Sequence, residues 1–431
     1  MNTRNVKWLY QQLPELVSRG IISQQNVDQI QQYYGQIADS GKKTFLVVCS
    51  IVGALLIGLG IVSLIAHNWD QLGRPIRAIL SMLPVIIGIC LTGWALLKRA
   101  SSDSYKEGTS LFLSLMIGAS IALICQTYNI SGDVRNFTLT WMLLTIPIVY
   151  LATATLPAVI YVIGITTWSL GYVWDNTRVS FFYWLLISAV IPHFVMTIRD
   201  TKFVVRSMLL STFLAISLGL VTSWTLVSIF PALWVISLPL VFSVVYLTGK
   251  QKFGQSGVTT SWQQPFNRLG NLGIVIMSLI LTYRWPWSEN HSSYWMGSVR
   301  EGSSFAGYTI LFLLICIAVV LEYFMIKQKR QEDSLRGAFP IVALIGFALK
   351  PLAMPLFNIY FLMLCIQQII SGIRLNRLAI VNSGLLMLAV LIALRFFDSD
   401  INFVLKGLVM IALGVGFLAT NAILISRRGG K

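Results

Sequence analysis

Long apolar runs separated by short polar segments make up the sequence from residue 44 onward. A transmembrane helix needs about 20 apolar residues to cross a hydrocarbon core about 30 Å thick. The pattern predicts fourteen spans, at 44–66, 78–97, 109–127, 138–153, 156–174, 180–198, 207–229, 232–249, 269–284, 305–326, 337–349, 352–373, 378–395 and 404–425.

Two of the uncharged stretches, 136–174 and 207–249, are too long to be single spans. As continuous helices they would be about 58 and 65 Å long at 1.5 Å per residue. Pro157 and Pro231 lie near their midpoints, and a proline interrupts a helix because it has no N–H to donate. Each stretch is therefore predicted to be a hairpin of two spans.

Two segments, 269–284 and 337–349, give weaker patterns. The second has about 13 residues, fewer than a span usually needs. It is a short helix, a re-entrant segment or half of a broken helix, and the nearby Pro351 and Pro355 are compatible with a break. If 337–349 does not cross the membrane, the number of spans is thirteen.

The distribution of positive charge orients the predicted spans. Cytoplasmic segments of membrane proteins are enriched in Lys and Arg. With fourteen spans and a cytoplasmic N-terminus, 23 of the 32 Lys and Arg residues lie on the cytoplasmic side. Thirteen spans would leave 21 there and would put the basic C-terminus outside. Fourteen spans with both termini cytoplasmic fit better.

The first 42 residues are polar and predict a cytoplasmic helical hairpin. One amphipathic stripe comprises Leu9, Leu13, Leu16 and Val17, and a second comprises Val27, Ile30 and Tyr34. Gly20 is placed to end the first helix and Ser23 to cap the second. Such a hairpin cannot form its own core, so it packs on the membrane domain, the membrane surface or a membrane-protein partner. No signal peptide is recognisable, so the first span acts as the insertion signal.

Composition supports an integral membrane protein. Of the 431 residues, 56% are hydrophobic and 11% are charged, whereas soluble domains have about 25% charged residues. The predicted fold is an all-α, polytopic integral membrane helical bundle at 43–426, preceded by the hairpin at 1–42.

The net charge is +16, but the Lys and Arg residues are scattered between apolar runs and form no basic face. This distribution argues against nucleic-acid binding. The five cysteines all lie in apolar runs without CxxC spacing, which indicates helix packing.

Several short motifs resemble a bacterial family of predicted membrane proteins, domain of unknown function 2157. They are Gly20-Ile21-Ile22-Ser23, Tyr33-Tyr34, Gly53, Gly58-Leu59-Gly60, His67-Asn68-Trp69, Arg74 with Arg77, Gly118, the segment from Gln126 to Asp133, Trp141, Asn382-Ser383-Gly384 and the segment from Arg395 to Asp398. The resemblance covers a core at about 44–174 and an end at 341–426, while 175–340 is less recognisable. It implies a multi-pass protein of the bacterial inner membrane and supplies no reaction.

Polar residues at the outer ends of three predicted spans form a candidate outward-facing site. They are His67, Asn68, Trp69, Asp70, Gln126, Tyr128, Asp133, Arg395 and Asp398. Flat rings beside amides and carboxylates suit a sugar or an amphiphile headgroup. The alternative is structural, because Trp and Tyr populate membrane interfaces and Asn and Asp cap helix ends. Arg395 and Asp398 are spaced to pair with each other.

Catalytic and metal-binding motifs are missing from the sequence. It has no HExxH, Walker lysine loop or GxSxG, and His67 with Asp70 lacks a third metal ligand. Intramembrane charge is sparse: Glu322 and Lys406 lie near span ends, and His193 follows Pro192. No catalytic residue, metal or cofactor is predicted.

Three functions remain open on the sequence. The first is a noncatalytic membrane protein that recognises an envelope lipid or glycan at an outward-facing site. The second is a transporter or flippase for a lipid-linked or small amphiphilic substrate, which a polar cavity at the midplane would favour. The third is an intramembrane enzyme.

Overall fold

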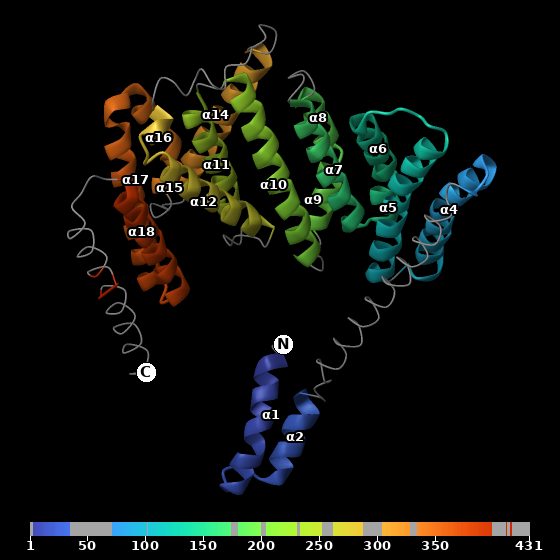
Figure 1. The fold of residues 1–431 in the computed structure, drawn as a ribbon. Helices are drawn as coiled ribbons and strands as arrows, with labels where there is room; N and C mark the ends of the chain where they lie inside the picture. Colours follow the sequence, from blue (N-terminus) through green and yellow to red (C-terminus); the bar gives the residue numbers. More distant parts are fainter. Residues whose placement is uncertain are drawn as a thin grey trace. The chain divides into compact units, whose positions relative to one another are not determined.

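The computed structural model describes residues 3–34, 71–100, 102–173, 180–199, 204–230, 233–251, 262–287, 304–327 and 334–398, with 411, 414 and 415. Within these ranges the regular structure is helical and includes no strand, so the all-α prediction is confirmed. The elements in Figure 1 are α1 (Thr3–Ser18), α2 (Gln24–Tyr34), α4 (Arg74–Lys98), α5 (Asp103–Thr127), α6 (Val134–Ala152), α7 (Thr155–Val173), α8 (Ser180–Ser188), α9 (Ile191–Arg199), α10 (Val204–Ile229), α11 (Trp234–Lys250), α12 (Gln263–Ile280), the short 3-10 helix η5 (Trp285–Trp287), α14 (Ser304–Lys327), α15 (Ser334–Gly337), α16 (Phe339–Ala348), α17 (Lys350–Arg374) and α18 (Leu378–Asp398).

The chain divides into two units, Met1–Ala78 and Ile79–Lys431. In the first unit α1 and α2 form the predicted hairpin, with Leu13 and Val27 buried between them. The first helix ends just before Gly20, which adopts the left-handed conformation (φ +70°). Glycine suits this position because L side chains rarely adopt that conformation. Ser23 caps the second helix by accepting a hydrogen bond from the Asn26 N–H at 3.3 Å. Both predicted boundaries are confirmed.

Helices of the second unit include seven segments long and apolar enough to cross a membrane, among the residues described. They are α4, α5, α6, Phe182–Arg199, α10, α17 and α18, and shorter apolar helices occur at Thr155–Gly171, Trp234–Lys250, Tyr308–Phe324 and Phe339–Ala348. A polytopic helical bundle is therefore confirmed. The count of fourteen stays a prediction, because 44–66 and nearly all of 404–425 lie outside the described residues.

Both predicted hairpins are present. Helix α6 ends at Ala152 and α7 begins at Thr155. Thr153 turns the chain in the left-handed conformation (φ 49°), and Pro157 lies in the first turn of the second helix. Helices α10 and α11 are likewise separate and pack against each other.

The predicted span at 180–198 corresponds to the apolar segment Phe182–Arg199, and a turn at Ala189 and Val190 divides it into α8 and α9. Pro192 follows the turn and removes one backbone donor. Two tyrosine hydroxyls from neighbouring helices satisfy carbonyls near the break: Tyr150 donates to Ala189, and Tyr161 donates to Leu186 at 2.9 Å. Such compensation is what lets an interrupted helix lie inside a membrane.

Small residues bring α11 and α12 into close contact. A Cβ built at Gly270 would overlap the backbone of Tyr246, and one at Gly249 would overlap the backbone of Asn267. At the opposite end of this antiparallel pair the Trp234 ring stacks on that of Trp285, which follows α12, with centroids 5.7 Å apart. Close backbone approach of this kind increases van der Waals contact between helices that share a lipid environment.

The segment 337–349 was predicted to be a short helix, a re-entrant segment or half of a broken helix. It forms the short helix α16, which packs antiparallel to α17. Gly346 lies against Ala353, and farther along the pair the Tyr360 hydroxyl donates to the Leu335 carbonyl at 2.9 Å. Leu349 connects the two helices in a non-helical conformation. A helix of 10 residues is about 15 Å long, which is half the hydrocarbon thickness, so α16 is the short arm of a hairpin.

Replacing Gly270 by alanine is expected to destabilise the protein, because the new methyl group overlaps backbone that cannot rotate away. Overpacking of this kind costs about 1–3 kcal/mol. The measurement is unfolding of the purified protein in mild detergent. Gly219→Ala in α10 is the control, because nothing lies within 4 Å of a Cβ built there. Equal stability of the two variants would contradict the close contact.

Cysteine labelling tests the predicted topology across α5. This helix has 25 residues and is about 38 Å long, so its ends lie on opposite sides of a membrane. In a background whose native cysteines are replaced by alanine, Asp133→Cys should react with an impermeant maleimide from outside intact cells. Ser104→Cys should react only after permeabilisation. The reverse pattern would invert the predicted orientation.

Candidate functional site

The predicted polar segment from Gln126 to Asp133 comprises the last two residues of α5 and the connection to α6. Asp133 is the N-cap of α6: its side chain accepts a hydrogen bond from the Arg135 N–H at 3.1 Å and pairs with the Arg135 guanidinium at 2.8 Å. The backbone hydrogen bond from Arg135 holds the pKa of this carboxyl below its usual value. Gln126 and Tyr128 are exposed. These contacts explain Asp133 as a helix cap.

The motif residues Gly118 and Trp141 contact each other. A Cβ built at Gly118 would lie 2.5 Å from the Trp141 ring, so only glycine leaves room for the indole. The indole N–H donates to the Ser114 carbonyl at 2.6 Å. This pair therefore fixes how α5 packs on α6.

Arg395, near the end of α18, contacts the residues that follow α12. Its guanidinium donates to the Thr282 hydroxyl at 3.2 Å and lies 4.4 Å from the centre of the Tyr283 ring. Helices α7 and α10 link α6 to α12, whose end Arg395 contacts, and Figure 1 shows α18 at the opposite side of the bundle from α5 and α6. The structure therefore brings Gln126, Tyr128 and Asp133 into one connection and Arg395 into another.

The remaining residues of the predicted outward-facing site lie outside the part of the chain that the structure describes. His67, Asn68, Trp69 and Asp70 lie outside the described residues, as does the side chain of Asp398. A ligand-binding role for the set stays a prediction. Among the residues described, no group of three His, Cys, Asp or Glu side chains is arranged to hold a metal ion.

A buried carboxylate joins α5 to the beginning of α7. Glu107, in the second turn of α5, is 9% exposed. Its two oxygens accept hydrogen bonds from the backbone N–H groups of Thr155 and Leu156, each at 2.8 Å. Those donors lie in the first turn of α7, where N–H groups have no acceptor within their own helix. Glu107 therefore caps a helix 48 residues away, at its electropositive end.

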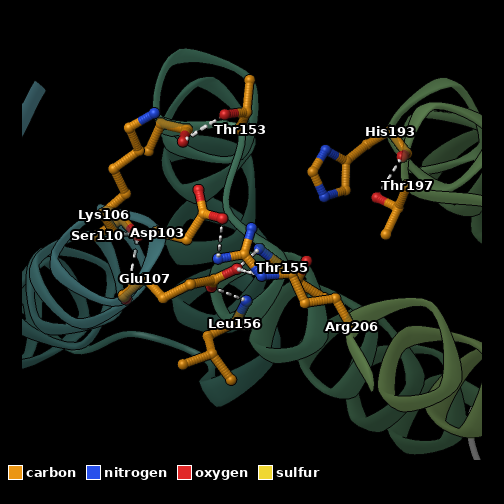
Figure 2. Close-up of polar contacts among 11 residues, drawn as sticks. Asp103, Lys106, Glu107, Ser110, Thr153, Thr155, Leu156, His193, Thr197 and Arg206 are labelled. Carbon is orange, nitrogen blue, oxygen red and sulfur yellow. Dashed lines mark hydrogen bonds and ion pairs between the residues drawn. The ribbon is translucent and has the colours of Figure 1, made fainter. Parts of the chain in front are cut away.

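Arg206 extends this cluster to α10. Its Nε lies 3.3 Å from Glu107 Oε1, and its guanidinium lies 3.7 Å from Asp103 Oδ2. Figure 2 shows the guanidinium between the two carboxylates and the start of α7. Since Asp103 and Glu107 are four residues apart, both project from one face of α5. The cluster thus ties together the ends of α5, α7 and α10.

His193 of α9 lies beside this cluster. It is 3% exposed, and its Nε2 has no hydrogen-bond partner among the described atoms. The Tyr150 ring packs edge-on against it with centroids 6.3 Å apart, and Figure 2 shows the imidazole apart from the contacts that join Asp103, Glu107 and Arg206. Burial agrees with the prediction of a helix-packing histidine.

A second polar cluster surrounds Arg336 in α15. This side chain is 6% exposed and donates to the amide oxygens of Asn271 (2.6 Å), Gln367 (2.9 Å) and Gln368 (2.6 Å). The Glu322 carboxylate of α14 lies against the next residue, Gly337. The three amide oxygens accept hydrogen bonds from the guanidinium, so these N–H donors are satisfied although the side chain is buried. Arg336 therefore connects α15 to α12 and to α17.

A groove of about 570 Å³ lies beside this cluster, along the last three turns of α17. Its lining residues are Leu335, Met363, Ile366, Gln367, Ile370, Ser371 and Arg374. On α17 they recur every three or four residues, so they occupy one face of the helix. Most of the wall is apolar, and Arg374 lies at the end of the helix.

The sequence reasoning missed Glu107, Arg206 and Arg336. All three lie in segments counted as loops between spans, where charged residues are expected. One signal was available, because Asp103 and Glu107 are spaced four residues apart directly before a predicted span. Nothing in the sequence indicated their partners, which come from helices far along the chain.

Replacing Glu107 by glutamine is expected to destabilise the protein, because a neutral amide offers one acceptor oxygen to three donors. Removing one partner of a buried ion pair costs about 3 kcal/mol or more. Asp103→Asn is the matched control: its carboxylate is 47% exposed and farther from Arg206, so its loss should be much smaller. Unfolding in mild detergent measures both, and equal losses would contradict the capping role.

Comparison with known proteins supports the membrane assignment. The chain matches no curated protein and no solved structure. One family, described as "Predicted membrane protein (DUF2157)", matches residues 14–158. The matched segment contains α2, α4, α5 and α6, with the Gly118–Trp141 pair and the capping residue Glu107. The family-like end predicted at 341–426 lies outside the match and stays a prediction. The resemblance predicted from the motifs of the N-terminal part is confirmed, and residues 14–158 of this membrane protein match the DUF2157 family.

Proposed function

We propose that this protein is a noncatalytic membrane protein that binds a membrane lipid in the groove along α17. The observation that carries the proposal is the groove itself, which combines an apolar wall with polar groups at one end. Met363, Ile366 and Ile370 are each between 43% and 50% exposed, although they belong to a membrane-spanning helix. Side chains exposed on such a helix face lipid, so the groove opens toward the acyl chains.

The arrangement of polar and apolar groups along the groove follows that of an amphiphile. Arg374 and Ser371 lie toward the end of α17, and Ile366 and Met363 lie deeper along the helix. The spacing from Met363 to Arg374 corresponds to about 17 Å at 1.5 Å per residue, roughly one leaflet. A lipid lying parallel to α17 would place its headgroup at the polar end and an acyl chain on the isoleucines.

The groove along α17 shares no residue with the outward-facing site predicted on the sequence. If the chain crosses the membrane at 337–349, as in the fourteen-span topology, the end of α17 faces the cytoplasm and the groove belongs to the inner leaflet. We place the protein in the cell membrane, as a multi-pass protein with both termini in the cytoplasm. Recognition of an envelope lipid or glycan at the outer face is a separate proposal that rests on residues 67–70 and 126–133.

A transporter or flippase is the second candidate, and one observation favours it. In the core between α7, α8 and α10 the hydroxyl of Ser217 lies 2.5 Å from that of Thr166 and 2.6 Å from that of Tyr183. A buried chain of hydroxyls offers polar partners within the bundle. Charged residues within the predicted spans are sparse, and such residues usually mark a substrate path through a membrane protein. Lipid binding is therefore the stronger proposal.

The helical hairpin at 1–42 is proposed to dock a membrane-protein partner. Its exposed residues include Ile21, a large apolar side chain that is 64% exposed at the tip of the hairpin.

Filling the groove should displace the lipid. Ile366→Trp places a large ring in the groove, and we expect the purified protein to retain several-fold less lipid, measured by native mass spectrometry after extraction in mild detergent. Ile359→Trp is the matched control, because Ile359 is exposed on the same helix but does not line the groove. Equal lipid retention by both variants and the unmodified protein would contradict the proposal.

A further inference from the structure

We propose that α9 pivots about the turn at Ala189 and Val190, and that Tyr150 of α6 is the latch that holds α9 in place. The turn divides a membrane-spanning segment, Phe182–Arg199, into two helices that are attached unequally to their neighbours. The pivot involves no residue of the groove along α17, so it stands apart from the proposed function.

The backbone at the turn lacks the hydrogen bonds of a continuous helix. The N–H groups of Ala189 and Val190 donate to carbonyls three residues back, at 3.2 and 3.1 Å. Bonds of this spacing have poorer geometry than those of an α-helix. Pro192 has no N–H, so it supplies no donor to the Ser188 carbonyl four residues before it. The chain can therefore bend here more easily than within either helix.

Helix α8 is fixed by buried hydrogen bonds. Tyr161 of α7 donates to the Leu186 carbonyl at 2.9 Å, and the Tyr183 hydroxyl of α8 lies 2.6 Å from that of Ser217 in α10. Both tyrosine side chains are fully buried. Separating such groups leaves polar atoms unsatisfied inside the protein, which costs free energy. These bonds therefore hold α8 to α7 and α10.

Helix α9 is attached mainly by apolar packing. It packs on α10, and the Phe194 ring lies edge-on to that of Trp262 with centroids 5.7 Å apart. Its two buried polar side chains form no hydrogen bond to another helix among the described residues: Thr197 donates to the His193 carbonyl at 2.8 Å, and His193 Nε2 has no partner there. Packed helices slide past each other by small shear movements, so these contacts allow α9 to change its tilt.

Tyr150 contacts both the turn and α9. Its hydroxyl donates to the Ala189 carbonyl, and its ring packs edge-on against the His193 imidazole with centroids 6.3 Å apart. Tyr150 lies in the last turn of α6 and is 38% exposed, whereas Tyr161 is fully buried. A tyrosine at a membrane interface has one end in contact with water, so the hydroxyl of Tyr150 has an alternative partner when the latch opens.

Opening the latch would move α9 away from α6 and uncover His193. In the fourteen-span topology α9 is the cytoplasmic half of its span, so the pivot would open the bundle toward the cytoplasm. Discontinuous membrane helices of this kind occur at the substrate sites of transporters. The pivot would therefore serve the second candidate function.

Hydrogen–deuterium exchange of the purified full-length protein in mild detergent, followed by mass spectrometry, measures the opening of each helix. Tyr150→Phe keeps the ring and removes the hydroxyl. We expect the amides of α9 to exchange about fivefold faster in this variant, the effect of losing one hydrogen bond, and those of α8 to be unchanged. Tyr128→Phe is the matched control, because the exposed Tyr128 hydroxyl forms no hydrogen bond among the residues described.

A second variant should have the opposite effect. Pro192→Ala returns an N–H to the position four residues after Ser188, which favours a continuous helix, so exchange in α9 should become slower. A general loss of stability would instead raise exchange in every helix. If Tyr150→Phe fails to fold, Pro192→Ala alone decides.

Three results would overturn the proposal: unchanged exchange of α9 in Tyr150→Phe, equally faster exchange of α8 and α9 in that variant, or no slowing of α9 in Pro192→Ala. The first and third would mean that the turn is a rigid kink. The second would mean that Tyr150 stabilises the bundle as a whole.

Discussion

The hydrocarbon core of a membrane offers no hydrogen-bond partners, so every backbone N–H and C=O group inside it must be satisfied by the protein. This constraint explains why the described structure is helical and why its interruptions are accompanied by specific side chains. At the break between α8 and α9, Tyr150 and Tyr161 donate to nearby carbonyls. At the start of α7, Glu107 accepts from two backbone N–H groups. At both places a polar side chain therefore bonds backbone groups next to a helix start or break.

Charge in this protein is used at helix ends. Glu107 and Arg206 hold the ends of α5, α7 and α10 together, and Arg336 holds α15 to α12 and α17 through three amide oxygens. Both clusters lie on the predicted cytoplasmic side. Close packing complements them, because Gly249 and Gly270 let two helix backbones touch. Gln367 accepts a hydrogen bond from Arg336 and also lines the groove along α17, so this groove adjoins the Arg336 cluster.

The residues that resemble the DUF2157 family have structural explanations where the structure describes them. Trp141 lies on Gly118 and donates to Ser114, Asp133 caps α6, and Ser383 accepts a hydrogen bond from Gln368 at 3.2 Å. These contacts maintain helix packing and helix boundaries. A signature made of such residues identifies a fold, and it says little about a ligand. The groove along α17 lies outside the matched segment, so lipid binding there is a proposal about this chain.

The sequence by itself determined the class of this protein and most of its helix boundaries, because those depend on local properties. Apolar runs long enough to span a bilayer indicated the bundle, and Pro157 and Gly20 indicated where helices separate. The tertiary structure decided what local patterns cannot encode. It divided 180–198 into two helices, made 337–349 the short arm of a hairpin, and paired Glu107 with the start of α7 and Arg336 with α17. It also separated Arg395 from the segment at 126–133. Each of these depends on contacts between residues tens to hundreds of positions apart, which the order of apolar and polar residues does not specify.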